Sequence, residues 1–176
     1  MPSSMTQGKK KKIDLTGVPY YPYFKEIIIH HTATPSEKKY DVEWCRALHL
    51  GKGWSDIGYH LYIEADGSIS MGRPLHKRGA HCSGRNMMSF GIAFVGGLKD
   101  GEPTNTLTPK QREALVACIA ELRKLTGKEL PVYSHRDFKA TFCPGFDASK
   151  EDWTPKKDVR TRNPKRVRKT DPGAVS

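Results

Sequence analysis

The chain alternates between short apolar runs and polar, turn-forming segments, a pattern that predicts an α/β fold. The run at residues 25–31 contains three successive isoleucines, whose β-branched side chains favour a strand. A longer apolar run at 89–95 and a short one at 130–134 predict two further strands. Segments 58–64 and 68–72 flank an Asp-Gly pair, which predicts a β-hairpin.

Two stretches have helical periodicity. Residues 41–50 begin with a cap-like aspartate and place apolar residues along one face. Thr108-Pro109-Lys110-Gln111 has the signature of a helix start, and Gly127 marks the end of that helix. A last helical turn is expected within 147–153. Because strands and helices interleave without strict βαβ regularity, we expect a single α/β domain whose central mixed sheet is flanked by helices.

The net charge of +11 is concentrated at the two ends of the chain. Lys9 to Lys12 form an uninterrupted basic run, and residues 154–176 carry eight Lys or Arg side chains against two Asp. The remainder is almost neutral. We therefore divide the chain into a basic extension at 1–24, a folded domain at 25–153, and a basic, disordered tail at 154–176. No apolar run is long enough to span a membrane, and no secretory signal is visible.

Cysteine usage argues against a disulfide scaffold or a zinc ribbon. Cys45, Cys82, Cys118 and Cys143 are scattered, without C-x-x-C spacing. We expect Cys118 and Cys45 to be buried free thiols within the two predicted helices.

Cys143 has more informative neighbours. His30 ends one predicted strand, His135 follows another, and Cys143 lies eight residues further on. Two imidazoles and a thiolate form a suitable ligand set for Zn²⁺, and three protein ligands leave a fourth position for water. Spacing alone does not select this triple, because seven His and four Cys allow many others. A core histidine and a buried thiol remain the alternative at this point.

Several ordered motifs resolve that choice. They are IIIHHTAT (27–34), WSDIGYH (54–60), GAHCSGRN (79–86), SFGIAFVGG (89–97) and the segment from His135 to Asp147. Together they resemble the zinc-dependent N-acetylmuramoyl-L-alanine amidases of the type 2 amidase and peptidoglycan recognition protein family, especially its short phage members. The resemblance covers about residues 25–153. It implies one Zn²⁺ in a surface groove at the strand ends, and cleavage of the bond between N-acetylmuramic acid and L-alanine by zinc-activated water.

The resemblance also implies roles for individual residues. The metal ligands match His30, His135 and Cys143, the catalytic positions match Tyr59 and Thr141, and the substrate groove matches His81 and Asn86. Phage members tend to have Lys at the position of Thr141, which leaves open whether Lys139 supplies that charge.

Three neighbouring residues are expected to be structural. His31 would point to the opposite face of the strand from His30, and His60 away from Tyr59. Asp137 is expected to be a turn residue, or else the hydrogen-bond partner of a ligand histidine.

The leading hypothesis is a phage endolysin that acts as a monomer on peptidoglycan. It would be made in the host cytoplasm and reach the wall after a separate protein permeabilises the membrane. A non-catalytic recognition module is disfavoured because Cys143 is present, and a cytosolic wall-recycling amidase because such enzymes usually have Asp as the third ligand.

The basic ends suggest an anionic partner. We expect them to bind an anionic envelope surface. Nucleic acid or RNA polymerase is the other possible partner, although the tails lack interleaved aromatic residues and a recognisable nucleic-acid-binding fold.

Overall fold

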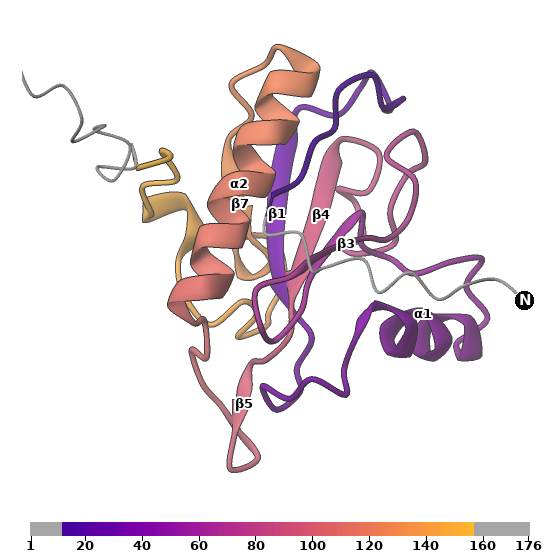
Figure 1. Cartoon of the computed structure of the whole chain (residues 1–176). Helices are drawn as coiled ribbons and strands as arrows, with labels where there is room; N and C mark the ends of the chain where they lie inside the picture. Colours follow the sequence, from indigo (N-terminus) through magenta and orange to yellow (C-terminus); the bar gives the residue numbers. More distant parts are fainter. Residues whose placement is uncertain (1–11, 157–176) are drawn as a thin grey trace, which may run out of the picture.

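The computed structural model describes residues 12–156 and is built on a five-stranded sheet (Figure 1). The strand order is β3-β2-β4-β1-β7. The strands are β1 (Glu26–His31), β2 (Leu61–Ile63), β3 (Ile69–Met71), β4 (Ser89–Phe94) and β7 (Val132–Ser134). The hairpin pair β2 and β3 is antiparallel, whereas β2, β4, β1 and β7 pair in parallel. The predicted mixed sheet is thus confirmed.

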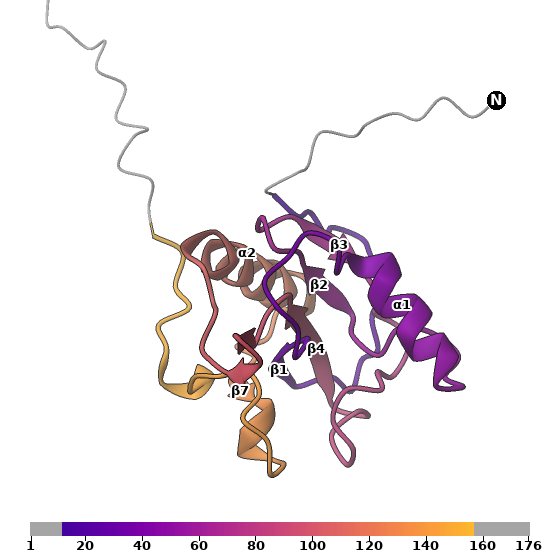
Figure 2. The same cartoon turned by 90° about the horizontal axis from the view of Figure 1, so that it is seen from below.

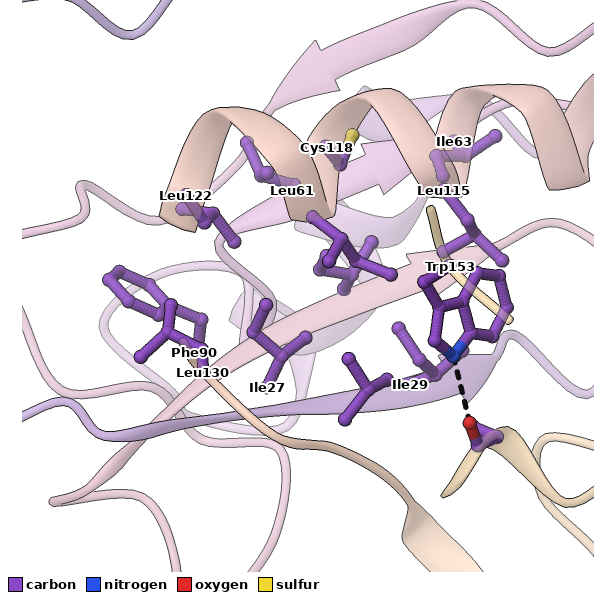
Figure 3. Close-up of a cluster of buried hydrophobic side chains, with 14 of the residues drawn as sticks. Ile27, Ile29, Leu61, Ile63, Phe90, Leu115, Cys118, Leu122, Leu130 and Trp153 are labelled. Carbon is purple, nitrogen blue, oxygen red and sulfur yellow. Dashed lines mark hydrogen bonds between the residues drawn. The ribbon is translucent and has the colours of Figure 1, made fainter. Parts of the chain in front are cut away.

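One face of the sheet packs against helix α2 (Pro109–Thr126). Every residue of β1 and β4 is buried, which fits central strands enclosed on both faces. Figure 3 shows the main core: Ile27 and Ile29 of β1 and Phe90 of β4 lie beneath Leu115 and Leu122 of α2. Alternation along β1 sends Ile27 and Ile29 into this core and therefore directs His30 to the opposite face.

The opposite face carries helix α1 (Val42–Gly51), so that the strands lie between the two helices (Figure 2). A smaller cluster there joins Cys45 of α1 to Tyr62 of β2 and Ala93 of β4. Both predicted helix starts are confirmed. The side chain of Asp41 accepts a hydrogen bond from the Trp44 amide at 2.8 Å, and Thr108 forms a capping box.

Differences from the predicted elements occur in short segments. The hairpin strand begins at Leu61 rather than at residue 58, because the preceding residues form a loop. A second sheet pairs β5 (Leu98–Lys99) with β6 (Glu102–Pro103), which sequence patterning did not indicate because each strand has only two residues. The expected last turn is present as a 3-10 helix at Ala148–Lys150.

Part of the expected N-terminal extension packs against the domain. Leu15 and Phe24 are buried in the main core. Most of the basic run at Lys9–Lys12 and most of the tail at 154–176 lie outside the described residues. Within the described part of the chain, no helix is both long enough and apolar enough to cross a membrane.

Candidate metal centre and active site

Three potential metal ligands converge at one edge of the sheet. His30 lies near the carboxyl end of β1, and His135 begins the 3-10 helix (His135–Asp137) that follows β7. Because β1 and β7 are parallel neighbours, these ends lie at the same edge. Cys143 returns to this point in the following loop, so that one ligand atom from each residue lies within 4.8 Å of the others. Parallel pairing therefore brings together residues more than 100 positions apart.

The orientation of His30 directs one ring nitrogen toward the thiol. Its Nδ1 lies 4.0 Å from Cys143 Sγ, while its Nε2 lies 2.8 Å from His81 Nδ1. Burial lowers the pKa of His30 well below its ordinary value, and the neighbouring His81 and His135 lower it further. The ring is therefore neutral near pH 7, which is the form that binds metals.

The Cys143 thiol is buried and lies close to the backbone of β1. Its Sγ accepts a hydrogen bond from the His31 amide at 3.2 Å. Burial raises the pKa of Cys143 to about 12, although the His31 hydrogen bond opposes this rise. A thiolate at this position would need a compensating cation.

This donor set fits Zn²⁺. Zinc prefers imidazole nitrogen and thiolate sulfur, and tetrahedral bond lengths place such donors about 3.5 Å apart. The 4.0 Å between His30 Nδ1 and Cys143 Sγ is close to that value. His31, by contrast, is not part of the cluster: its Nδ1 accepts from the Ala33 amide at 3.0 Å. Of the adjacent pair, His30 is thus the one that lies in the group able to hold a metal ion.

Tyr59 lies beside the ligands. Its ring centroid is 5.2 Å from that of His30, and the side chain is half-buried. Burial raises the pKa of Tyr59 above its ordinary value, and the nearby Cys45 and Cys143 thiols add to this effect. The phenol therefore keeps its proton near neutral pH and can act as a hydrogen-bond donor.

Thr141 lies on the loop that carries Cys143, called the ligand loop below. Its Oγ1 accepts a hydrogen bond from the Cys143 amide at 3.2 Å, and the residue is exposed. Because the oxygen accepts in this hydrogen bond, the Thr141 hydroxyl can donate its proton to a different acceptor. Lys139 is exposed, and its amide bonds to the His135 carbonyl at 3.1 Å.

The two residues predicted in the substrate groove differ in exposure. Asn86 is half-buried, and its Oδ1 accepts from the amides of His81 and Cys82 at 2.9 and 3.0 Å. His81 is buried, with Nδ1 against His30 and Nε2 3.3 Å from the Ser89 carbonyl oxygen. Both of its ring nitrogens thus have partners inside the protein.

The residues expected to be structural have hydrogen bonds that fit that role. His60 is fully buried and bonds to the backbone at Gly91 and Lys77. The Asp137 carboxylate accepts from the Ser134 amide at 2.8 Å and thereby caps the short helix that begins at His135. Asp137 is thus the predicted turn residue.

Two residues that hold the Tyr59 loop were not predicted from the sequence. His49 accepts from the Gly58 amide at 2.9 Å through Nδ1. The Arg73 guanidinium donates to the carbonyls of Ile57, Asp56 and Arg78 at 2.8, 3.1 and 2.8 Å. Neither belongs to a recognisable motif. Only the folded loop reveals that they fix the residues preceding Tyr59.

Comparisons with known proteins point to one family. Residues 20–146 match the family described as N-acetylmuramoyl-L-alanine amidase. An endolysin of Klebsiella phage KP32 is 35% identical over 138 residues, covering 77% of this chain and 89% of the relative. An endolysin of Escherichia phage T7 is 33% identical over 137 residues, covering 77% of this chain and 88% of the relative.

Solved structures of amidases and recognition proteins also resemble this chain. The endolysin amidase LysCS from Clostridium intestinale superimposes with a TM-score of 0.61 at 33% identity, covering 73% of this chain and 81% of its own. The recognition protein PGRP-SA of Apis mellifera also gives 0.61, at 28% identity, covering 76% and 84%. The match over residues 20–146, together with these relatives, shows that the chain belongs to the N-acetylmuramoyl-L-alanine amidase family.

Proposed function

We propose that this chain is a zinc-dependent peptidoglycan amidase of the phage endolysin type. It would hydrolyse the amide between the lactyl group of N-acetylmuramic acid and L-alanine. The observation that carries the proposal is the convergence of His30, His135 and Cys143 within a chain of this family. The relatives with the name endolysin, matched over most of their length, support action on the bacterial wall.

The protein's own groups supply binding and hydrogen bonding at the reacting amide. His30, His135 and Cys143 would hold one Zn²⁺. When bound, the ion supplies a Lewis acid that lowers the pKa of water and polarises a carbonyl. Tyr59, kept protonated by burial, donates a hydrogen bond to the oxygen on which negative charge develops.

Thr141 can donate from the ligand loop, because its oxygen already accepts from the Cys143 amide. Asn86 is the better placed of the two predicted groove residues to contact substrate, since it is half-buried whereas His81 is buried. For His81, its contact with His30 favours a different role.

The test is digestion of purified sacculi followed by mass spectrometry of the products. The wild type with zinc should release stem peptides with a free L-alanine amino group and leave the glycan strands intact. Removal of the metal by a chelator should abolish release, and added Zn²⁺ should restore it. Cys143→Ser should bind zinc more weakly and release little product. The matched control is Cys118→Ser, which alters a buried thiol in α2 remote from the ligands.

The alternatives predict other results. New reducing sugar ends would indicate a glycosidase, and undiminished activity of metal-free protein would contradict zinc dependence. Binding to sacculi without any cleavage would indicate a recognition module. PGRP-SA, one of the similar solved structures, is named as such a recognition protein. Cleavage of soluble muropeptides but not sacculi would indicate a wall-recycling enzyme.

We further propose that the basic ends concentrate the enzyme on an anionic envelope. This rests on sequence alone: residues 154–176 carry eight Lys or Arg against two Asp. Deleting this segment should weaken binding to whole cells at low salt and leave hydrolysis of small muropeptides unchanged. Unchanged cell binding, or a tail that binds RNA or RNA polymerase but not cells, would contradict the proposal.

A further inference from the structure

We propose that His81 is a positioning residue for the metal centre, which orients His30 by accepting a hydrogen bond from it. The inference rests on the zinc site proposed above. His30 Nε2 lies 2.8 Å from His81 Nδ1, and the two rings are almost perpendicular, at 87°. The partner of a metal-ligating histidine is commonly a carboxylate or a carbonyl oxygen. Here it is a second imidazole.

The direction of this hydrogen bond follows from the chemistry of the two rings. A neutral imidazole carries a single proton. His30 Nδ1 faces Cys143 Sγ and is the atom available to the metal, so the proton of His30 lies on Nε2. His81 Nδ1 must therefore accept. The remaining proton of His81 then lies on its Nε2, directed at an acceptor on β4.

That acceptor is the backbone of Ser89. Its carbonyl oxygen lies 3.3 Å from His81 Nε2, and a carbonyl can only accept. The Ser89 hydroxyl, 3.4 Å from the same nitrogen, donates to the Arg85 carbonyl at 2.7 Å and so presents a lone pair to His81. A one-directional chain of hydrogen bonds thus runs from the metal ligand to the first residue of a fully buried strand.

The fold reserves space for the His81 ring. A Cβ built on Gly91 would lie 2.6 Å from ring atoms of His81, and one built on Gly79 would lie 2.5 Å from the ring. The amide of His81 is held by Asn86 at 2.9 Å. The two glycines leave room for the His81 ring, and the Asn86 hydrogen bond fixes the backbone that carries it. The ring is thereby held where its Nδ1 contacts His30.

The test compares His81→Asn with His81→Leu, because the asparagine and leucine side chains are nearly equal to each other in size and shape. Asparagine carries an oxygen on Cγ, where histidine carries Nδ1, and can still accept from His30, whereas leucine cannot. Loss of such a partner typically weakens metal binding 10- to 100-fold. We expect His81→Leu to bind zinc about 10- to 100-fold more weakly than His81→Asn, measured by competition with a chelator of known affinity.

His60 provides the matched control. It is also a buried histidine with both ring nitrogens bonded, but its partners are the Gly91 amide and the Lys77 carbonyl. His60→Asn and His60→Leu should change the free energy of unfolding while binding zinc with equal affinity. Equal zinc affinity of the two His81 variants would overturn the proposal, as would an equal loss in His60→Leu. Failure of the wild type itself to bind zinc would refute the proposed function instead.

A measurement on the unaltered protein covers the case in which His81→Leu does not fold. Nitrogen-15 NMR of the zinc-loaded wild type distinguishes the two neutral forms of each histidine. We expect His81 to carry its proton on Nε2 and to accept through Nδ1. A proton on His81 Nδ1 would overturn the proposal.

Discussion

Replacing His60 with asparagine should make the folded protein less sensitive to acid. The His60 ring is fully buried, with Nδ1 accepting from the Gly91 amide at 3.0 Å and Nε2 donating to the Lys77 carbonyl at 2.8 Å. A second proton would have to displace the Gly91 amide and bring a charge into the core. Asparagine can still accept from Gly91 but does not titrate in this range.

The magnitude follows from the pKa of the ring. Burial lowers the pKa of His60 from 6.5 to about 4, the charge of Arg73 lowers it further, and the bond to Lys77 opposes the change. Between these two pH values the unfolded chain binds a proton at His60 that the folded protein does not bind. The free energy of unfolding therefore falls as the pH drops from 6.5 toward 4 and is insensitive to this group above 6.5. At pH 4.5 the loss amounts to about 2 to 3 kcal/mol.

The assay is urea unfolding of the metal-free wild type and His60→Asn, at pH 7.5 and pH 4.5. At pH 7.5 the variant should be less stable by about 1 kcal/mol, because it loses the hydrogen bond to Lys77. At pH 4.5 that deficit should vanish or reverse. Acid effects of His30 and His49 occur in both proteins and cancel in the difference. His81 is the exception, because burial and the neighbouring His60 both lower its pKa, and its ring centroid lies 5.9 Å from that of His60.

His76→Asn, at an exposed histidine, controls for the loss of one imidazole from the chain. The reasoning would be refuted if wild type and His60→Asn differed by the same free energy at both pH values.

Three further changes test other parts of the site. Tyr59→Phe should lower kcat for amide cleavage by about 100-fold or more, because it removes one hydrogen-bond donor to the developing charge, with zinc affinity unchanged; normal turnover would exclude the proposed role. Arg73→Lys should destabilise the fold by about 2 kcal/mol in urea unfolding, since an ammonium group cannot reproduce a planar fork bonded to three carbonyls; a stability equal to wild type would show that those bonds contribute nothing. Arg85→Gln should cost about 3 kcal/mol, because it leaves the buried Glu26 carboxylate without its cation. Adding Glu26→Gln to that variant should recover part of the loss, and strictly additive effects in this double-mutant cycle would contradict a direct ion pair.

Local patterns were sufficient to predict the elements that carry the site. Three isoleucines predict β1, and the Thr108–Gln111 signature predicts the first residue of α2, because strand and helix-start preferences depend on neighbouring residues. The hairpin of β5 and β6 was not predicted, because a strand of two residues is too short to show an alternating hydrophobic pattern. The burial of Leu15 was not predicted for a different reason. Leu15 contacts α2, more than 100 residues away in the chain, and the polar sequence around Leu15 contains no pattern that indicates this contact.

The candidate ligands His30, His135 and Cys143 were predicted from motifs that resemble the amidase family, not from strand geometry. The structure adds the physical reason for their proximity, because β1 and β7 are parallel neighbours whose carboxyl ends lie at the same edge of the sheet. The positioning role that we propose for His81 was not predictable in this way. A histidine that lines a groove and one that supports a metal ligand can occupy the same place in the same motif, and they differ only in where their ring nitrogens point. That orientation depends on Gly91 of β4 and Gly79 of the preceding loop, which the chain brings against the ring only when the loop folds onto the sheet. The motif therefore indicates that an imidazole lies beside the proposed metal site, whereas the contacts with His30 and Ser89 support the positioning role that we propose for it.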